Sequence, residues 1–368
     1  MNPKVKVKID DLKEGCIISE DVFSLTKRPI VPNKTIVKKE IIDILKAFLI
    51  KEVEIEKILL DGTNFSKTEL VNEIESNKAL NSDVTLVGKV EDHFLIAVRA
   101  FKKEFANWQA GSTIDISNIR QIMIPLIDKF VDSPSQLFTL HYLSTKEEYI
   151  YQHSVAVGLL SAYIGRQLNY DKAEILQLAL GGCLADCGMA KMKESILQKK
   201  AGLTRDEFDE VKQHPIQSYK MIKDITILRE QTKLGILQHH ERLDGSGYPQ
   251  GKSGQNISDY AKIIAVADTF HAMTSSRNYR QKSSIFKVLE QMLEDNFGKY
   301  DLNLLTILSK SIVKLSVGTR VKLSDDTIAE IIFLDEKKPT RPLVKLENEG
   351  IIIPLEKNRQ LFIEEILL

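Results

Sequence analysis

The 368-residue sequence has few of the features that mark secreted, membrane-embedded or polyanion-binding proteins. Its 3 cysteines, Cys16, Cys183 and Cys187, are too few for a disulfide framework and suit a reducing cytoplasm. The 51 basic and 51 acidic residues cancel, which removes any global attraction to nucleic acid polymers or membrane surfaces. No apolar run approaches bilayer-spanning length, and the amino terminus lacks the apolar core of a signal peptide. We expect a cytoplasmic protein without membrane insertion.

The composition is that of an ordinary globular protein, with 43% hydrophobic and 28% charged residues. The length exceeds a single typical core, so several domains are expected. Residues 4–9 and 53–56 alternate as strands do, and residues 39–49 carry apolar side chains at helical spacing. We therefore predict a small α/β unit over residues 1–65, whose end is marked by loop-forming residues 61–64.

A connecting region, predicted over residues 66–146, begins with a polar stretch that reads as a linker. Helical patterns follow at about residues 91–108 and 116–132. His93 and His141 belong to this region, and neither has a partner at metal-ligand spacing. We interpret both as ordinary hydrogen-bonded or solvated histidines.

Residues 147–315 form a succession of helical patterns with short breaks and few strand patterns, which predicts an all-α domain. Thr204 and Glu207 have the spacing of a capping box, and we expect the helix that they begin to carry His214. Ser258 begins another helix, which runs through Asp268. Short β-prone runs separated by turn residues then predict a small β-barrel or meander over residues 316–368.

Residues 239–249, His-His-Glu-Arg-Leu-Asp-Gly-Ser-Gly-Tyr-Pro, concentrate metal-ligand chemistry in a short segment. Neutral imidazole is a common ligand of transition metals, and adjacent histidines at a helix end can both turn inward. Asp186 and Asp268 lie on apolar helical stretches, where an unpaired carboxylate is costly. Five of the 7 histidines belong to the same domain: His153, His214, His239, His240 and His271. Together these side chains predict a site for one or two divalent metal ions in the helical core.

Residues from about 147 to 312 resemble an HD-GYP domain, the bacterial branch of the HD phosphohydrolase superfamily associated with cyclic di-GMP hydrolysis. The matching segments are Tyr-Gln-His-Ser at 151–154, residues 203–215, His-His-Glu-Arg-Leu-Asp-Gly-Ser-Gly-Tyr-Pro-Gln-Gly-Lys-Ser-Gly at 239–254, and residues 261–280. The resemblance covers nearly half of the chain. It implies a mainly α fold, in which the helical domain is flanked by the α/β unit and the β domain.

The resemblance also implies a metal centre, usually of iron or manganese, at full or partial occupancy. His153 and Asp268 would serve one ion, and Asp186 would bridge to a second. The remaining ligands of the second ion would be His214, His239 and His240. The implied reaction is two-metal phosphodiester hydrolysis, in which a metal-bridging hydroxide attacks phosphorus. Asp186 is therefore the predicted catalytic residue.

Substrate binding is assigned by the same resemblance. Arg277 and Arg280 match basic positions expected to grip phosphate, a role suited to guanidinium groups. The resemblance also assigns substrate binding to Gly247, Tyr248 and Pro249. The implied ligand is cyclic di-GMP or a related nucleotide. Two further partners are possible from the sequence. One is a signalling protein that binds the Gly-Tyr-Pro loop, and the other is a second copy of the chain in a homodimer.

Four positions differ from the HD-GYP pattern. Ala185 and Met189 stand where the pattern His-Asp-x-Gly-Lys has its histidine and lysine, and Lys191 points to a different helical face. His271 replaces an acidic residue, and Tyr149 is not the glutamate of trimetallic members. Loss of the hydrogen-bond partner of a metal ligand lowers metal affinity by about 10–100-fold. Loss of a ligand itself should lower the affinity of the first metal position by at least as much. Thiolates from Cys183 or Cys187 are an alternative donor, although buried cysteine is more often a small hydrophobe.

These differences leave three functional hypotheses. The first is a degenerate HD-GYP protein that binds cyclic di-GMP or a protein partner with little or no turnover. The alternative is an active metal-dependent cyclic di-GMP phosphodiesterase that runs on the ligands that remain. A third is a scaffold without metal, whose polar centre is only hydrogen-bonded.

Overall fold

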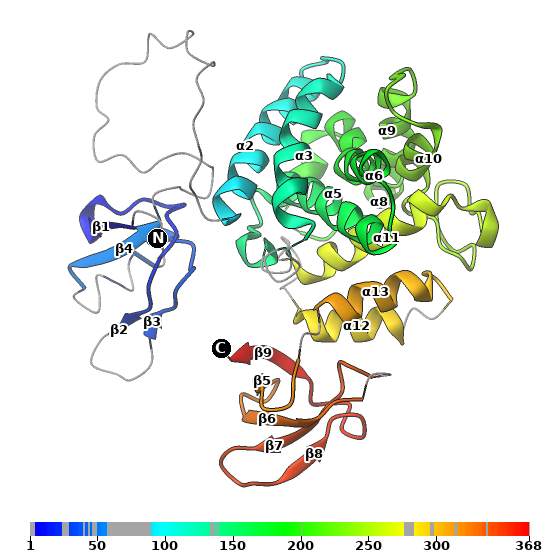
Figure 1. Ribbon diagram of the computed structural model, residues 1–368. Helices are drawn as coiled ribbons and strands as arrows, with labels where there is room; N and C mark the ends of the chain where they lie inside the picture. Colours follow the sequence, from blue (N-terminus) through cyan, green and yellow to red (C-terminus); the bar gives the residue numbers. More distant parts are fainter. Residues whose placement is uncertain are drawn as a thin grey trace. The chain divides into compact units, whose positions relative to one another are not determined.

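The computed structural model of the chain describes residues 4–23, 29–39, 41–42, 45, 50–56, 90–132, 137, 140–199, 201–275, 283–294, 298–312, 315–335 and 338–367. The chain divides into two compact units, Met1–Ala100 and Phe101–Leu368. Figure 1 labels their helices and strands. The predicted boundaries at residues 65, 146 and 315 are finer than this division and stay predictions.

The first unit contains two small antiparallel strand pairs. β1 (Lys4–Lys8) pairs with β4 (Glu52–Glu56), and β2 (Val22–Phe23) pairs with β3 (Pro29–Val31). A 3-10 turn, η1 (Ile9–Asp11), follows β1. Alternation places Val7 and Ile55 in a core with Ile18 and Val31, as the sequence pattern predicts. The expected helix over residues 39–49 lies largely outside the described residues, as do residues 61–64 and the linker.

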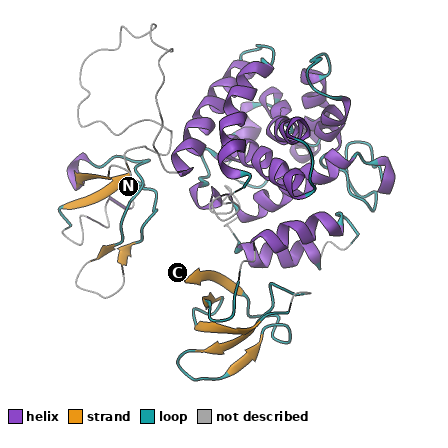
Figure 2. Ribbon diagram, in the orientation of Figure 1, coloured by secondary structure: helices purple, strands orange, loops and turns teal. Residues whose placement is uncertain are grey.

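The helical part of the second unit confirms the all-α prediction (Figure 2). The helices predicted near residues 91–108 and 116–132 are α2 (Val90–Gln109), whose first part belongs to the first unit, and α3 (Ile116–Phe130). The helices and 3-10 turns that follow, in chain order, are η2 (Leu140–Leu143), α5 (Tyr149–Gln167), α6 (Lys172–Leu184), η3 (Cys187–Lys191), α7 (Glu194–Leu197), α8 (Arg205–Val211), α9 (His214–Ile222), α10 (Glu230–Gln238), η4 (Gly254–Asn256), α11 (Asp259–Thr274), α12 (Ile285–Leu293) and α13 (Leu302–Ile312). α5, α6 and α11 pack against one another at the centre (Figure 1).

α6 is a buried core helix. It begins at a capping box, in which the Asp171 carboxylate accepts from the backbone of Glu174 and the Glu174 carboxylate accepts from the backbone of Asp171. By length and hydropathy alone, the segment Lys172–Lys191 could cross a bilayer, in contrast to the expectation from sequence. However, 72% of its apolar window is buried inside the protein, which is the setting of a core helix in this fold.

The break between α8 and α9 differs from the prediction. Thr204 and Glu207 form the expected capping box and begin α8, but α8 ends at Val211 and His214 begins a new helix. The expectation that one helix joins the cap to His214 was wrong. Pro215 explains the break, because proline is tolerated in the first turn of a helix and disrupts the interior.

The carboxyl-terminal residues form a five-stranded antiparallel sheet in the order β8-β7-β6-β5-β9. Its strands are β5 (Arg320–Leu323), β6 (Ile328–Phe333), β7 (Leu343–Leu346), β8 (Ile352–Pro354) and β9 (Ile363–Leu367). The first four form the predicted meander. β9 was not predicted, and it returns to pair with β5. Phe286 of α12 packs into the apolar core of this sheet.

Candidate metal centre

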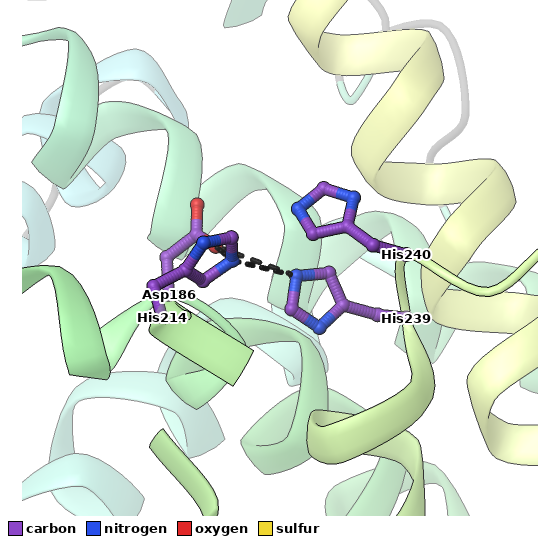
Figure 3. A group of neighbouring side chains, drawn as sticks. All are labelled: Asp186, His214, His239 and His240. Carbon is purple, nitrogen blue, oxygen red and sulfur yellow. Dashed lines mark hydrogen bonds and ion pairs between the residues drawn. The ribbon is translucent and has the colours of Figure 1, made fainter. Parts of the chain in front are cut away.

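One cluster of four donors lies where α9, the end of α10 and the start of η3 meet. His214 is the first residue of α9, His239 and His240 follow α10, and Asp186 directly precedes η3. One donor atom from each residue lies within 4.8 Å of the others (Figure 3). Asp186 was expected on a helix, but α6 ends at Leu184 and the carboxylate projects from the turn that follows.

Two imidazoles of this cluster turn their Nε2 atoms toward each other. His214 Nδ1 lies 2.7 Å from the Val211 carbonyl, and His239 Nδ1 lies 2.7 Å from the Ile236 carbonyl. A carbonyl only accepts hydrogen bonds, so each Nδ1 carries a proton. The two Nε2 atoms lie 3.2 Å apart beside the Asp186 carboxylate, where each can offer its lone pair to a cation when it is unprotonated. Such a convergence of electron-rich atoms fits a bound cation.

A second cluster of three donors adjoins the first and consists of His153, Asp186 and Asp268. His153 lies on α5, and Asp268 lies on α11. His153 Nε2 is 2.9 Å from Asp268 Oδ1 and 3.5 Å from Asp186 Oδ2. His153 and Asp268 are 3% and 7% exposed, so this cluster has little access to bulk water.

Asp186 belongs to both clusters and presents a different oxygen to each. Its Oδ1 is 3.1 Å from His214 Nε2 and 3.5 Å from His239 Nε2, whereas its Oδ2 faces His153. Burial alone would raise the pKa of Asp186. Hydrogen bonds from His214 and His239, together with nearby imidazole charge, outweigh burial and hold the pKa well below its ordinary value. The carboxylate is therefore ionised and placed to bridge two cations.

The ionisation states of the neighbouring ligands also suit a cation. Burial, reinforced by His239, lowers the pKa of His240 well below its ordinary value, which leaves the ring neutral and able to coordinate. Burial opposes ionisation of Asp268, but the hydrogen bond from His153 helps to lower its pKa below the ordinary value. Neutral imidazoles and ionised carboxylates are the forms that bind metal.

Ser218 of α9 holds the turn that carries Asp186. Its hydroxyl donates to the Ala185 carbonyl at 2.7 Å and accepts from the Gly188 N–H at 2.8 Å, so one side chain bridges both flanks of Asp186. Gly188 leaves no room for a side chain, because a Cβ there would lie 2.3 Å from the His214 carbonyl oxygen. This contact joins two ligand-bearing segments.

The loop after His240 is held by Glu241. Both carboxylate oxygens of this buried residue accept backbone N–H groups, from Gln250 at 2.7 Å and from Lys252 at 3.0 Å. Gly247 passes so close to the preceding backbone that a Cβ would lie 2.4 Å from the Arg242 nitrogen. A cis peptide bond joins Tyr248 to Pro249, and the Tyr248 ring stacks on His240 at 4.6 Å between centroids. The predicted Gly-Tyr-Pro block therefore borders a metal ligand.

Other predicted groups take no part in the described clusters. Arg277 and Arg280 lie outside the described residues. Lys191 donates to the Trp108 carbonyl at 2.6 Å, in keeping with the expectation that it does not replace the missing lysine. Burial raises the pKa of the Cys187 thiol to about 12 and that of Cys183 further, which disfavours the thiolate alternative. His93 is buried in α2, and the side chain of His141 lies outside the described residues.

Sequence reasoning gave no role to Ser218, and nothing in the residues around it signals one. Glu241 was visible in the motif, but its partners on the far side of the loop were not. His271 was counted among the histidines of the helical domain and noted as a departure from a family pattern, but it was given no role. It lies beside the three-donor cluster, where its Nδ1 is 2.9 Å from Nδ1 of His153.

The helical domain that carries these donors is similar to known proteins. Residues 139–304 match the family model described as HD domain. Cyclic di-GMP phosphodiesterase PA4108 of Pseudomonas aeruginosa is 30% identical over 242 residues, which are 66% of this chain and 58% of that protein. Cyclic di-GMP phosphodiesterase PdeB of Borreliella burgdorferi is 30% identical over 219 residues, 58% of this chain and 56% of the relative. Residues 139–304 are therefore an HD domain.

The fold of the chain agrees with that assignment. Its structure is similar to that of Bd1817, an HDG"Y"P protein from Bdellovibrio bacteriovorus, with a TM-score of 0.51 and 15% identity, covering 83% of this chain and 98% of that one. A more distant relative in sequence is the 3'3'-cGAMP-specific phosphodiesterase 1 of Vibrio cholerae, 30% identical over 46% of this chain and 39% of the relative. The chain spans little more than half the length of the three phosphodiesterases that it matches in sequence, 58% at most.

Proposed function

We propose that this protein is a metal-dependent phosphodiesterase that hydrolyses a cyclic dinucleotide, with cyclic di-GMP as the first candidate substrate. One observation carries the proposal: Asp186 presents one oxygen to each of two adjoining donor clusters. A carboxylate in this position suits a two-metal site, the arrangement used to hydrolyse phosphodiesters. The names of the relatives add the substrate class, because they refer to cyclic di-GMP and to 3'3'-cGAMP.

The side chains present fit two divalent ions, with iron or manganese favoured by the mixture of imidazole and carboxylate donors. The four-donor cluster would hold one ion, and His153, Asp186 and Asp268 would hold the other. Bound ions of this kind supply an acidified water and neutralise charge that develops on the phosphoryl oxygens. The protein contributes oriented Nε2 lone pairs and a bridging carboxylate that remains ionised.

Substrate binding is the part of the proposal that depends most on sequence. Arg277 and Arg280 follow α11 in the chain and are proposed to bind the phosphates. Gly247, Tyr248 and Pro249 are proposed to line the entrance, since the Tyr248 ring lies against the metal ligand His240. The buried free cysteines suit catalysis in a reducing cytoplasm.

A second candidate function is binding of the same nucleotide without turnover. The observation that favours it is the small three-donor cluster, because buried Ala185 stands where the HD-GYP pattern has a histidine. Met189 replaces the lysine, and Lys191 is engaged by the Trp108 carbonyl. In this alternative the Gly-Tyr-Pro loop transmits the signal to a protein partner or to a second copy of the chain.

Anaerobic turnover decides between the two functions. The purified protein is incubated with Fe²⁺ or Mn²⁺ and either cyclic di-GMP or 3'3'-cGAMP, beside Asp186→Asn and the double variant Ala185→His/Met189→Lys. We expect wild type to form the linear dinucleotide and Asp186→Asn to be inactive.

Each other outcome has a distinct meaning. Turnover by the double variant alone shows that the site retains its geometry and that the natural protein lacks only the groups needed for catalysis. Turnover that survives in Asp186→Asn or in excess chelator contradicts the two-metal mechanism. Binding of either nucleotide, followed by equilibrium dialysis, separates an inactive binder from a protein with no affinity for this substrate class.

A further inference from the structure

His271 occupies a buried position directly behind the metal ligand His153. His153 directs Nε2 toward Asp268 and Asp186 and directs its other nitrogen, Nδ1, away from them. That Nδ1 lies 2.9 Å from Nδ1 of His271, and the ring centroids are 5.1 Å apart. Both histidines are 3% exposed, so the contact forms away from bulk water.

The placement of protons in this pair follows from the chemistry of imidazole. A neutral imidazole that offers the Nε2 lone pair to a cation must carry its proton on Nδ1. When a cation takes the Nε2 lone pair, the proton on His153 Nδ1 faces His271 Nδ1 at 2.9 Å and the Tyr149 hydroxyl at 3.2 Å. His271 Nδ1 is the nearer of the two and can accept this proton when its own ring carries a proton on Nε2. The Ser275 hydroxyl lies 3.3 Å from Nδ1 and 3.4 Å from Nε2 of His271.

We propose that His271 is a positioning residue that fixes the tautomer and orientation of His153, and thereby sets cation affinity at the three-donor cluster. The inference rests on the proposed metal-dependent function. Metal-binding histidines generally donate their second N–H to a carboxylate, a carbonyl or water, and such partners strongly affect metal affinity. Here the partner is a second imidazole, at a position where the HD-GYP pattern has an acidic residue.

The helical geometry of α11 supports this role. Asp268 and His271 are three residues apart on α11 and therefore share one face. The same helix face supplies a carboxylate to one nitrogen of His153 and an acceptor to the other. His153 is thus held at both ring nitrogens by one element.

The surroundings of His271 keep this arrangement dry. A cavity of about 10 Å³ beside it is lined mainly by apolar side chains, among them Leu160 and Phe270. Such a volume holds about one water molecule at most. Bulk water therefore does not replace His271 as the partner of His153.

Titration with Mn²⁺ alone tests the inference without relying on turnover. The protein is stripped with EDTA, and free Mn²⁺ is followed by electron paramagnetic resonance during titration. His271→Leu places a carbon where Nδ1 stood, whereas His271→Asn places an amide oxygen at the same distance from the backbone. We expect His271→Leu to lower the affinity for one of the two Mn²⁺ ions by about 10–100-fold. His271→Asn should retain both ions near wild-type affinity.

The ion held by the four-donor cluster is an internal control, because its affinity should be the same in all three proteins. His93→Leu, the same change at a buried histidine of α2, should leave both ions unaffected. Thermal unfolding in EDTA checks that each variant is folded. If His271→Leu does not fold, His271→Met fills the space with a flexible apolar chain and carries the same expectation.

Two results overturn the inference while leaving the proposed function intact. The first is wild-type affinity for both ions in His271→Leu. The second is an equal loss in His271→Leu and His271→Asn, which would show that imidazole packing matters and hydrogen-bond acceptance does not. A wild-type protein that binds no Mn²⁺ or Fe²⁺ would instead contradict the metal-dependent function itself.

Discussion

A single hydroxyl group, that of Ser218, determines the geometry of the turn that carries Asp186. It bonds the Ala185 carbonyl and the Gly188 N–H, and both would lose a buried partner in Ser218→Ala. We expect this variant to lose about 1–3 kcal/mol of unfolding free energy. Urea denaturation of the metal-free protein measures the effect. Ser161→Ala is the matched control, because the buried Ser161 hydroxyl has no hydrogen-bond partner among the described residues, and equal losses in both variants would contradict the assigned role.

The three cysteine thiols of the chain should be chemically silent. Burial raises the pKa of Cys187 to about 12 and raises those of Cys183 and Cys16, so almost no thiolate exists at neutral pH. We expect iodoacetamide to leave all three unmodified in the native protein at pH 8 and to modify them after unfolding in guanidinium chloride. Mass spectrometry of the digested protein measures the labelling. Rapid labelling of Cys187 in the native state would restore the thiolate alternative.

At the scale of a single element, the loop between α10 and α11 depends on the carboxylate of Glu241. In Glu241→Gln, an amide nitrogen replaces one oxygen that accepts a backbone N–H, which leaves Gln250 or Lys252 without its buried acceptor. We expect faster hydrogen exchange across residues 243–256, by an amount equivalent to about 1–3 kcal/mol. Glu230→Gln is the control, because Glu230 is an exposed residue at the start of α10. Unchanged exchange in Glu241→Gln would show that the loop is held by other contacts.

Local sequence signals predicted elements where the relevant partners lie within a few residues. Thr204 and Ser258 begin helices as expected, because capping depends on groups only three residues away. The prediction of one helix from Thr204 through His214 was wrong. Pro215 indicates the start of a new helix, and the prediction did not take it into account. β9 was missed because its pairing with β5 depends on contacts more than 40 residues apart in the chain.

The same limit applies to the site. His153 and Asp268 are separated by 115 residues, and their contact cannot be derived from periodicity. Only the HD-GYP resemblance placed them together. That resemblance did not extend to His271 or Ser218, whose roles come from the position of one nitrogen and one hydroxyl group.

At the scale of the whole second unit, one buried ion pair links the carboxyl-terminal sheet to the helices. Arg341 pairs with Glu290 of α12, and its guanidinium also donates to the carbonyls of Leu355 and Arg359. The two side chains are 7% and 14% exposed. Arg341→Met would leave Glu290 buried without this partner, and we expect a loss of about 3–5 kcal/mol.

A double-variant cycle measures this coupling by chemical denaturation. Glu290→Met removes the stranded carboxylate, so the double variant should be more stable than Arg341→Met alone. The exposed pair of Lys338 and Glu356 is the control, for which the coupling should be below about 1 kcal/mol. Additive losses at Arg341 and Glu290 would show that the pair does not couple the sheet to α12.

Trp108 gives the protein an intrinsic optical reporter. It is the single tryptophan of the chain and is fully buried beside Phe101. Its backbone carbonyl accepts a hydrogen bond from the ammonium group of Lys191, the last residue of η3. Its fluorescence therefore belongs to the second unit and to the segment that follows Asp186. The emission should shift to longer wavelength when that unit unfolds, whereas residues 1–100 contain no tryptophan to report their own unfolding. Emission and circular dichroism recorded on one sample would thus distinguish the melting of the two units without any added label.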